Sequence, residues 1–415
     1  MTAVRRKSMS IVYNGVEAWA DLSPYLEKFT YTDSVDKSDT IAISLSDRDL
    51  KWVNSWIPQK GDVVLPSIIL ENWNHEGEKM AFACGSFTVD DFSFSSPPLA
   101  GSINGVSAPV NSSFKETERT RTWEAATIQV IAAELAGKYG LTLTYDADDI
   151  QVKKMEQGGQ SDSEFLSALC KKYGLGIKVY SNRLVIWDYK RYYRQAPVMT
   201  LCQTDVSKWE YKSTMQGTYT GAQVSYTNPA TKKTVDVLVG TEERLYKTTQ
   251  KADSEADAIL IGEAAILEAN RKETTMQLTL SPKLSLMATK TVQLSGFGRM
   301  DGPYFINSVT HTISRKAYSM KVQLSRIPSD DTGGDSGGDT GEVGSTGTGS
   351  QAYIVQKGDT LWDLAGQFYG SPSRCTEIYA VNQEVIEAAA KQHGKDSSNN
   401  GYWIWPGTTL TIPGR

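Results

Sequence analysis

A 22-residue stretch near the C-terminus most strongly limits how this chain can fold. Residues 329–350, SDDTGGDSGGDTGEVGSTGTGS, contain five acidic residues, no basic residue and a single valine. Such a segment cannot bury enough apolar surface to offset the entropy lost on folding, so we expect a flexible tether that spans about 25 Å. The tether divides the chain into a body, residues 1–328, and a small C-terminal module, residues 351–415.

The tether also accounts for the charge of the chain. The formal net charge of −5 equals the five acids of this segment, so the rest of the chain is close to neutral. A body without excess positive charge gives no support to nucleic-acid binding, and no sequence-specific nucleic-acid partner is predicted. The basic N-terminus is not followed by an apolar stretch, and no apolar run is long enough to cross a bilayer, so we expect neither a signal peptide nor a membrane span.

The body begins with a β-rich region, residues 1–115. Its short apolar runs alternate with polar residues, as in IAISLSD from Ile41 and FTVDDFSFS from Phe87, and turn-forming residues separate them. A period of two is typical of half-buried strands. We therefore expect a barrel or sandwich without a helix.

Residues 116–199 contain a repeated helix–turn–strand pattern. AATIQVIAAELAGKYGLTLTY and SDSEFLSALCKKYGLGIKVY each place apolar residues on one helical face before a shared KYGL. Ser161 and Glu164 have the spacing of a capping box, and Gly140 and Gly174 lie where a helix ends in left-handed backbone. The pattern predicts an α/β insert in the β body. The expected buried faces are Ile128, Ile131, Ala132 and Leu135 in the first helix and Phe165, Leu166, Leu169 and Tyr173 in the second.

Strand patterns return in residues 200–328, where one helical run interrupts them. SEADAILIGEAAILEANRKE predicts a helix over residues 253–272 with Asp253 as its N-cap. The fold class expected from these patterns is mainly β with an α/β insert.

The order of these segments resembles the late control protein D family, the baseplate hub of contractile phage tails. The phrases that carry the resemblance are IAAELAGKYGLTL, EQGGQSDSEFLSALCKKYGLGIKVYSNRLVIWD, EANRKETTMQLTL and LSGFGRMDGPYFINSVTHTISRKAYSMKVQLSRI. Their order along the chain is more specific than any one of them. The chain departs from the family pattern at Met287 to Thr289, where we expect a glycine near the end of a turn.

This resemblance implies a structural protein. Residues 1–115 and 200–328 would be tandem β-barrels, and a homotrimer would present them as a pseudo-sixfold ring between the tail tube protein and a trimeric spike protein. Baseplate wedge proteins are further implied partners. The implied location is the tail baseplate of a phage or phage-like injection particle, assembled in the cytoplasm of the host bacterium, and no cofactor is implied.

From Tyr353 onward the chain resembles a LysM domain, a small βααβ module that binds glycans containing N-acetylglucosamine. The matching phrases are YIVQKGDTLWDLAGQFYG, EIYAVNQ and IWPGTTLTIP. The helical spacing of the first phrase agrees with this fold. The buried face that it predicts is Leu361, Leu364, Ala365 and Phe368.

In this family the sugar lies in a shallow groove between two loops. Backbone N–H and C=O groups of such loops can bond the N-acetyl group while apolar side chains cover its methyl. The resemblance assigns glycan binding to Gly358, Asp359, Thr360 and Leu361 in the first loop and to Ile404, Trp405, Pro406 and Gly407 in the second.

Two alternatives stay open for the LysM module. It contacts peptidoglycan, or it docks on a baseplate protein, with Trp362 and Trp405 acting as core residues. The segment between Asn382 and Tyr402 is longer than usual for the family because EVIEAAAKQHGKDSSNNG is inserted there. We expect this insertion to extend the second helix and to add a loop that redirects or partly covers the groove.

The main alternative function is a peptidoglycan-targeted hydrolase or a cell-wall adhesin with a LysM anchor. Its chemistry is not apparent, because His75, His311 and His393 lie in unrelated regions and His311 has the alternating context of a hydrogen-bonded core histidine. No HExxH motif or Cys–His nucleophile pattern occurs, and the four cysteines are too widely spaced for a zinc site. We therefore predict no catalytic residue and no metal site.

Overall fold

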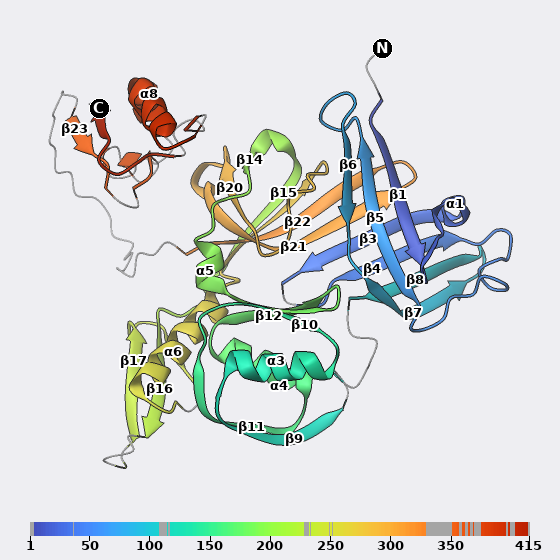
Figure 1. Cartoon of the computed structure of the whole chain (residues 1–415), viewed down its shortest axis with the longest axis horizontal. Helices are drawn as coiled ribbons and strands as arrows, with labels where there is room; N and C mark the ends of the chain where they lie inside the picture. The colour runs from blue at the N-terminus through green and yellow to red at the C-terminus, as the bar shows by residue number, and fades with distance from the viewer. Residues whose placement is uncertain are drawn as a thin grey trace. The chain divides into compact units, whose positions relative to one another are not determined.

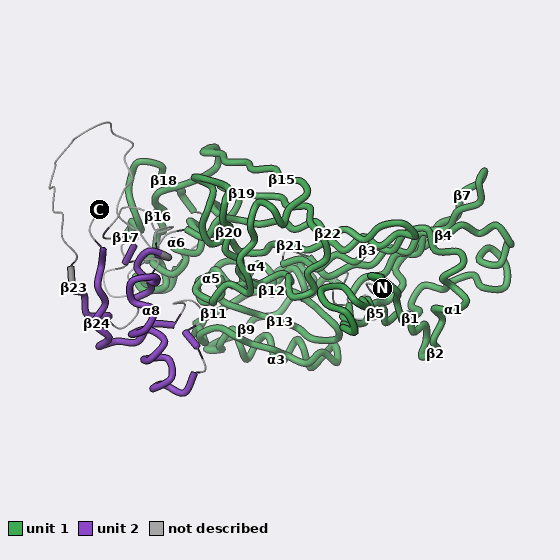
Figure 2. Tube along the Cα trace, turned by 90° about the horizontal axis from the view of Figure 1, so that it is seen from above, with its two compact units in different colours: residues 1–332 green, residues 333–415 purple. Residues whose placement is uncertain are grey.

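The computed structural model describes residues 4–328 and 351–413, apart from short gaps. The gaps are residues 36, 108–113, 115–116, 228–231, 233, 249, 251, 357–358, 362–363, 366–367, 369–374, 396 and 399–402. The chain forms two compact units, residues 1–332 and 333–415 (Figure 2). The predicted tether lies outside the described residues.

The N-terminal region of the larger unit is built mainly from strands. These are β1 (Arg6–Tyr13), β2 (Val16–Glu17), β3 (Leu26–Ser34), β4 (Thr40–Ser46), β5 (Val63–Glu71), β6 (Lys79–Ala83), β7 (Phe87–Ser95) and β8 (Ala100–Val106). The prediction that no helix occurs here was wrong, because α1 (Trp19–Leu22) forms a single turn. The Glu17 carboxylate accepts the N–H of Trp19 at 3.0 Å, a local contact that leaves no periodic pattern in the sequence.

The remaining elements of the larger unit alternate between strands and helices. In chain order they are β9 (Glu118–Thr127), α3 (Ile128–Lys138), β10 (Thr142–Asp146), β11 (Gln151–Ser161), α4 (Asp162–Lys172), β12 (Leu175–Tyr180), β13 (Arg183–Asp188), α5 (Tyr189–Tyr193), β14 (Thr200–Cys202), β15 (Val206–Ser213), β16 (Gly221–Thr227), β17 (Thr234–Gly240), β18 (Leu245–Lys247), α6 (Glu255–Asn270), β19 (Thr274–Leu280), β20 (Thr291–Ser295), β21 (Gly302–Ser314) and β22 (Tyr318–Arg326).

One continuous sheet joins the two β-rich ends of this unit. Its strand order is β15-β19-β22-β21-β3-β4-β8-β7-β5-β1-β2, with β20 also beside β21, β14 beside β20 and β6 beside β5. The long strand β21 makes the join, because its first residues pair with β20 and residues Ser308–Ser314 pair with β3. Each half of the sheet covers its own hydrophobic core, one around Phe29, Ile43 and Ile68 and the other around Leu278, Val309 and Val322.

The α/β insert has the predicted helix–turn–strand units. Figure 1 shows α3 and α4 between the β10-β13-β12 sheet and the β9–β11 ribbon. Ser161 and Glu164 form the predicted capping box, and Gly140 and Gly174 have φ values of +66° and +68° at the helix ends. The predicted apolar faces of both helices are buried in one core. The fold class expected from the sequence, mainly β with an α/β insert, is confirmed.

One segment lies elsewhere than the sequence suggests. Residues 221–270 were expected to belong with the second barrel, but β16, β17 and β18 form a separate sheet against which α6 packs. Val224 and Ile261 of this segment are buried in the same core as α3 and α4. Tertiary packing explains this placement. Apolar side chains lie on two sides of α6, of which one packs against β16 and β17 and the other against α4.

Two local details differ from expectation. The N-cap of α6 is Ser254, whose side chain accepts the Asp257 N–H, and not Asp253. The turn where a glycine was expected uses Thr289, which has a φ of +72°. Its N–H donates to the Ile306 carbonyl at 3.0 Å, so tertiary contacts hold a threonine in left-handed backbone.

The smaller unit has the predicted βααβ order as far as it is described. β23 (Gln351–Ile354) pairs antiparallel with β24 (Thr409–Ile412), and α8 spans Cys375–Gln392. The described residues of the first helix, Leu361, Leu364, Ala365 and Phe368, are helical and contribute to the core, as predicted.

Candidate functional site

The two loops that the LysM resemblance assigns to glycan binding lie next to each other. Val355 N–H donates to the Thr408 carbonyl at 2.9 Å, and Gly407 N–H donates to the Val355 carbonyl at 2.8 Å. These bonds continue the β23–β24 pairing and bring the first loop to the edge of the second. Gly358 and Trp362 lie outside the described residues.

The first loop is held by its own side chains. The Asp359 carboxylate accepts the Gln356 N–H at 2.7 Å and the Tyr353 hydroxyl at 2.8 Å. The hydrogen bond to Asp359 raises the pKa of Tyr353. Leu361 is only 4% exposed and packs in the core. Asp359 and Leu361 therefore shape the loop, and Thr360 is the assigned side chain that is exposed beside them.

The second loop is a turn with an aromatic side chain before it. Thr408 N–H donates to the Trp405 carbonyl at 3.1 Å, and Gly407 has a φ of +89°, a conformation that favours glycine. Pro406 and Gly407 are exposed, whereas Ile404 packs against the core. The turn thus presents backbone groups and the partly buried Trp405 ring at the rim.

The insertion reaches this rim, as its length suggested. It extends α8 to Gln392, and the His393 ring then stacks on Trp405 with centroids 5.1 Å apart and planes at 2°. Gly394, with a φ of +71°, ends the helix, and Lys395 N–H donates to the Ala390 carbonyl at 2.9 Å. This is the hydrogen bonding of a Schellman cap, and it fixes the backbone of Gly394 and Lys395.

Sequence reasoning missed two residues beside this stack. Trp403 is 45% exposed, and the Lys395 ammonium lies 5.2 Å from its ring centroid. The only signal in the sequence was the unusual length of the insertion, which does not reveal where its side chains point.

Asn382 fixes the start of the helical extension to the sheet. Its side chain is 4% exposed and donates to the carbonyls of Ile378 and Thr411, each at 2.7 Å. It also accepts the Thr411 N–H at 2.7 Å. The two bonds to Thr411 hold α8 in register with β24, because leaving any of these buried groups unpaired would be costly.

Glu387 attaches the loop of the insertion to α8. It accepts the side-chain hydroxyl of Ser398, the Ser398 N–H at 3.0 Å and the Tyr379 hydroxyl at 2.9 Å. The bonds from Ser398, followed by that from Tyr379, lower the pKa of Glu387 to about 2.

We expect this carboxylate to make the smaller unit acid-sensitive. A folded-state pKa below the unfolded value of 4.5 means that the stabilisation is present above pH 4.5 and is lost as pH falls towards 2. Thermal unfolding of residues 351–415 at pH 7 and at pH 2–3 should show this loss, and Glu387→Gln should reduce it. Glu384→Gln, on the exposed face of the same helix, is the control; equal pH dependence in both variants would contradict the assignment.

A second cluster of charged groups lies buried in the larger unit. The Lys178 ammonium on β12 is 2.7 Å from the Asp33 carboxylate on β3 and 3.0 Å from that of Asp39. Asp33 also accepts the Ala288 N–H at 2.7 Å. The cluster therefore joins the α/β insert to both halves of the sheet. Burial, with the nearby Asp33 charge, raises the pKa of Asp39 to about 7.

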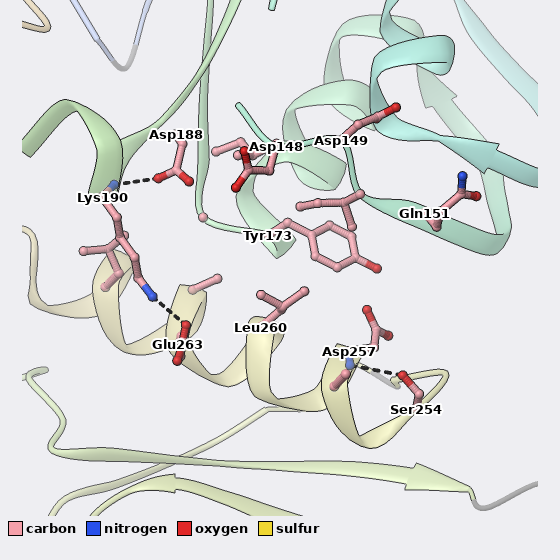
Figure 3. A pocket seen from close by; sticks show the side chains of 16 residues that line it. Asp148, Asp149, Gln151, Tyr173, Asp188, Lys190, Ser254, Asp257, Leu260 and Glu263 are labelled. Atoms are coloured by element: carbon pink, nitrogen blue, oxygen red, sulfur yellow. Dashed lines mark hydrogen bonds and ion pairs between the residues drawn. The ribbon is translucent and has the colours of Figure 1, made fainter. Parts of the chain in front are cut away.

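A cavity of about 460 Å³ lies between α6, the loop that follows β10 and the junction of β13 with α5 (Figure 3). Two of its charged groups pair with each other, Lys190 and Glu263, and the Asp188 carboxylate accepts the backbone N–H of Lys190 at 2.7 Å. Ser254 caps α6 at the other end of the cavity. These contacts stabilise helix ends and do not form a recognisable catalytic arrangement.

His311 is a core residue, as predicted. It is 1% exposed, its Nδ1 lies 2.7 Å from the Tyr318 hydroxyl, and burial lowers its pKa to about 4.

Within the described ranges, no group of three His, Cys, Asp or Glu side chains is placed to hold a metal ion. Among the helices that the structure describes, none has the length and apolarity needed to cross a bilayer.

Comparisons with known proteins agree with both resemblances. Residues 108–317, just over half of the chain, match the family model described as phage tail baseplate hub (GPD), and residues 353–413 match the LysM domain. A probable baseplate hub protein of Escherichia phage 186 is 21% identical over 368 residues, which cover 76% of this chain and 91% of that protein. The uncharacterized protein YqbP of Bacillus subtilis (strain 168) is 44% identical over 63 residues, 15% of this chain and 27% of that protein.

Two solved structures share the fold of the larger part of the chain. The 43 kDa tail protein of prophage MuSo2 from Shewanella oneidensis has a TM-score of 0.60 at 13% identity, covering 77% of this chain and 98% of that chain. A tail protein from Neisseria meningitidis MC58 has a TM-score of 0.57 at 12% identity, covering 77% and 96%.

Proposed function

This chain belongs to the phage tail baseplate hub family, and from this premise we propose that it joins the tail tube to the spike in a phage or phage-like injection particle. The family match over residues 108–317 carries the proposal. The chain is a structural component of a phage tail baseplate, and its C-terminal part is a LysM domain. We assign it no catalytic step, and its assembly into the baseplate would take place in the cytoplasm of the host bacterium.

We infer a homotrimer from the organisation of the sheet. Each chain has two β halves with separate cores, joined edge to edge through β3 and β21. Three chains would offer six such halves to a sixfold tube on one side and a threefold axis to a spike on the other. Wedge proteins would contact the outside of this ring.

The mass of the full chain in solution tests this assembly. Sedimentation or light scattering should give three times the chain mass of 45.7 kDa, and mixing with the cognate tube protein should give a larger complex. A monomer at all concentrations that clears a peptidoglycan suspension would instead support the hydrolase alternative.

For the LysM domain we propose contact with cell-wall glycan during penetration. The two hydrogen-bonded loops support this proposal, because Thr360 of the first and Pro406 and Gly407 of the second are exposed. The full chain should sediment with insoluble peptidoglycan, whereas a chain ending at residue 328 should stay in the supernatant. Equal sedimentation of the two proteins would refute glycan contact by this domain.

One observation favours docking on a baseplate protein as a second candidate. Val381 and Val385, one helical turn apart on α8, are 58% and 46% exposed. Exposed apolar side chains on one face are typical of a protein interface. Replacing both by glutamine should abolish wedge-protein binding if this face docks, and should leave peptidoglycan binding unchanged.

A further inference from the structure

The insertion adds a cationic end to one side of the predicted glycan groove. The C-terminal end of α8 and the residues after it carry Lys391, His393 and Lys395, all exposed. The carboxylate of Glu387, one turn earlier on α8, is already engaged by hydrogen bonds from Ser398. The two lysines lie at the C-terminal end of α8, where the negative end of the helix dipole favours positive charge.

His393 and Lys395 lie beside two aromatic rings, those of Trp405 in the second loop and Trp403 just before it. His393 is stacked on Trp405, and the Lys395 ammonium is 5.2 Å from the centroid of Trp403. The Trp403 N–H donates to the Ser398 carbonyl at 2.9 Å, and Ser398 is bonded to Glu387 on α8. The Trp403 backbone is therefore fixed to the insertion, while 45% of the residue surface is exposed.

This combination differs from a groove that binds only a neutral sugar. A tryptophan ring offers a flat apolar surface to the C–H face of a pyranose, and an ammonium group offers a charge-assisted bond to a carboxylate or a phosphate. The Schellman cap at Gly394 fixes the backbone of Lys395 before a ligand arrives, so binding needs to order only the side chain.

We propose that Trp403 and Lys395 extend the glycan groove into a subsite for an anionic cell-wall polymer, with a sugar ring on Trp403 and its carboxylate or phosphate on Lys395. The inference rests on the proposed glycan contact of the LysM domain and adds the charge of the preferred ligand. The insertion thereby redirects the groove towards charged wall polymers and is not simply a cover over Trp405.

Binding of the full chain to three insoluble polymers tests the subsite. The probes are chitin, which is neutral, peptidoglycan stripped of phosphate polymers, and walls that retain them. Lys395→Gln should bind stripped peptidoglycan, phosphate-bearing walls or both about three- to fivefold more weakly than the wild type does. Its binding to chitin should equal that of the wild type. High salt should remove the difference. Lys316→Gln, an equal change of charge on the exposed β21–β22 turn, should bind all three polymers as the wild type does.

A second variant guards against a folding artefact. Trp403→Ala should weaken binding to all three polymers, and Trp403→Phe should restore most of it, while circular dichroism shows the LysM fold intact. A Lys395→Gln loss restricted to phosphate-bearing walls identifies phosphate as the ligand group, and a loss on stripped peptidoglycan identifies carboxylate.

Two other outcomes distinguish the anionic subsite from glycan contact by the LysM domain. Unchanged wall binding by Lys395→Gln, with wild-type binding to chitin retained, overturns the anionic subsite and leaves glycan contact standing. Failure of the wild-type chain to bind any of the three polymers overturns both.

Discussion

Replacing Lys178 by methionine is expected to lower the free energy of unfolding of the larger unit by about 3–5 kcal/mol, because it leaves two buried carboxylates without their cation. Lys178 is mostly buried, with its side chain 11% exposed, and Asp39 is fully buried. Burial alone would lower the pKa of Lys178, but Asp33 and Asp39 more than offset this and raise it. The cluster is thus an ion pair at a junction and not a surface salt bridge.

Urea unfolding of residues 1–328 at a single protein concentration measures this loss. Lys190→Met is the matched control, since Lys190 and Glu263 are 48% and 40% exposed and their pair should contribute at most about 1 kcal/mol. Adding Asp39→Asn to Lys178→Met should recover part of the loss. Equal stability of the two lysine variants would show that the cluster does not hold the junction.

The free energy of unfolding that Lys178→Met removes should increase with pH. The folded-state pKa of Asp39 is raised to about 7, above its unfolded value of 3.8, so the ionised carboxylate costs stability as pH rises through this interval. Without Lys178 the penalty for ionisation is larger. The free energy of unfolding of the variant should therefore be closest to that of the wild type near pH 4–5 and furthest from it above pH 7.

Gly176→Ala is the second change for which we expect a large effect, a loss of about 3 kcal/mol or more. Gly176 pairs with Trp187 across β12 and β13, and a Cβ at this glycine would lie 2.1 Å from Cε2 of the indole. Trp187 is fully buried and packs edge-on against Tyr189 with centroids 5.6 Å apart, so the ring has no space into which to move.

An exposed glycine of the same α/β insert provides the control with the opposite sign. Gly137 lies in the last turn of α3, and a Cβ there would meet nothing within 4 Å. Gly137→Ala should stabilise the unit by about 0.5–1 kcal/mol, because alanine loses less backbone entropy in a helix. Thermal unfolding of residues 1–328 compares the two variants, and destabilisation by both would point to a general intolerance of the insert.

The contrast between local and tertiary contacts explains which predictions succeeded. The capping box of Ser161 and Glu164, the helix-ending Gly174 and the buried face of the first LysM helix are encoded within a few residues of sequence. The N-cap of α6 shows the limit of this reasoning, because Asp253 and Ser254 both suit a cap and only the backbone geometry distinguishes them.

The functional sites were less accessible to sequence reasoning. The family pattern predicts the two loops of a LysM groove, and the structure shows that Leu361 is a core residue and Asp359 a turn-forming one. His393, Lys395 and Trp403 were not assigned to the site. They come together because α8 is extended by a segment that carries no family pattern, and its end reaches the second loop.

By itself, the sequence determined the identity of this protein as a hub-like β body with an α/β insert and a C-terminal LysM domain. It could do so because strand alternation, helical periodicity and turn chemistry are read over short distances along the chain. Only the tertiary structure decided that residues 221–270 join the core of α3 and α4, that Lys178 joins three segments, and that His393 stacks on Trp405. These contacts link residues that are far apart in the sequence or separated by a turn, and their energies come from burial and charge pairing that no local pattern records.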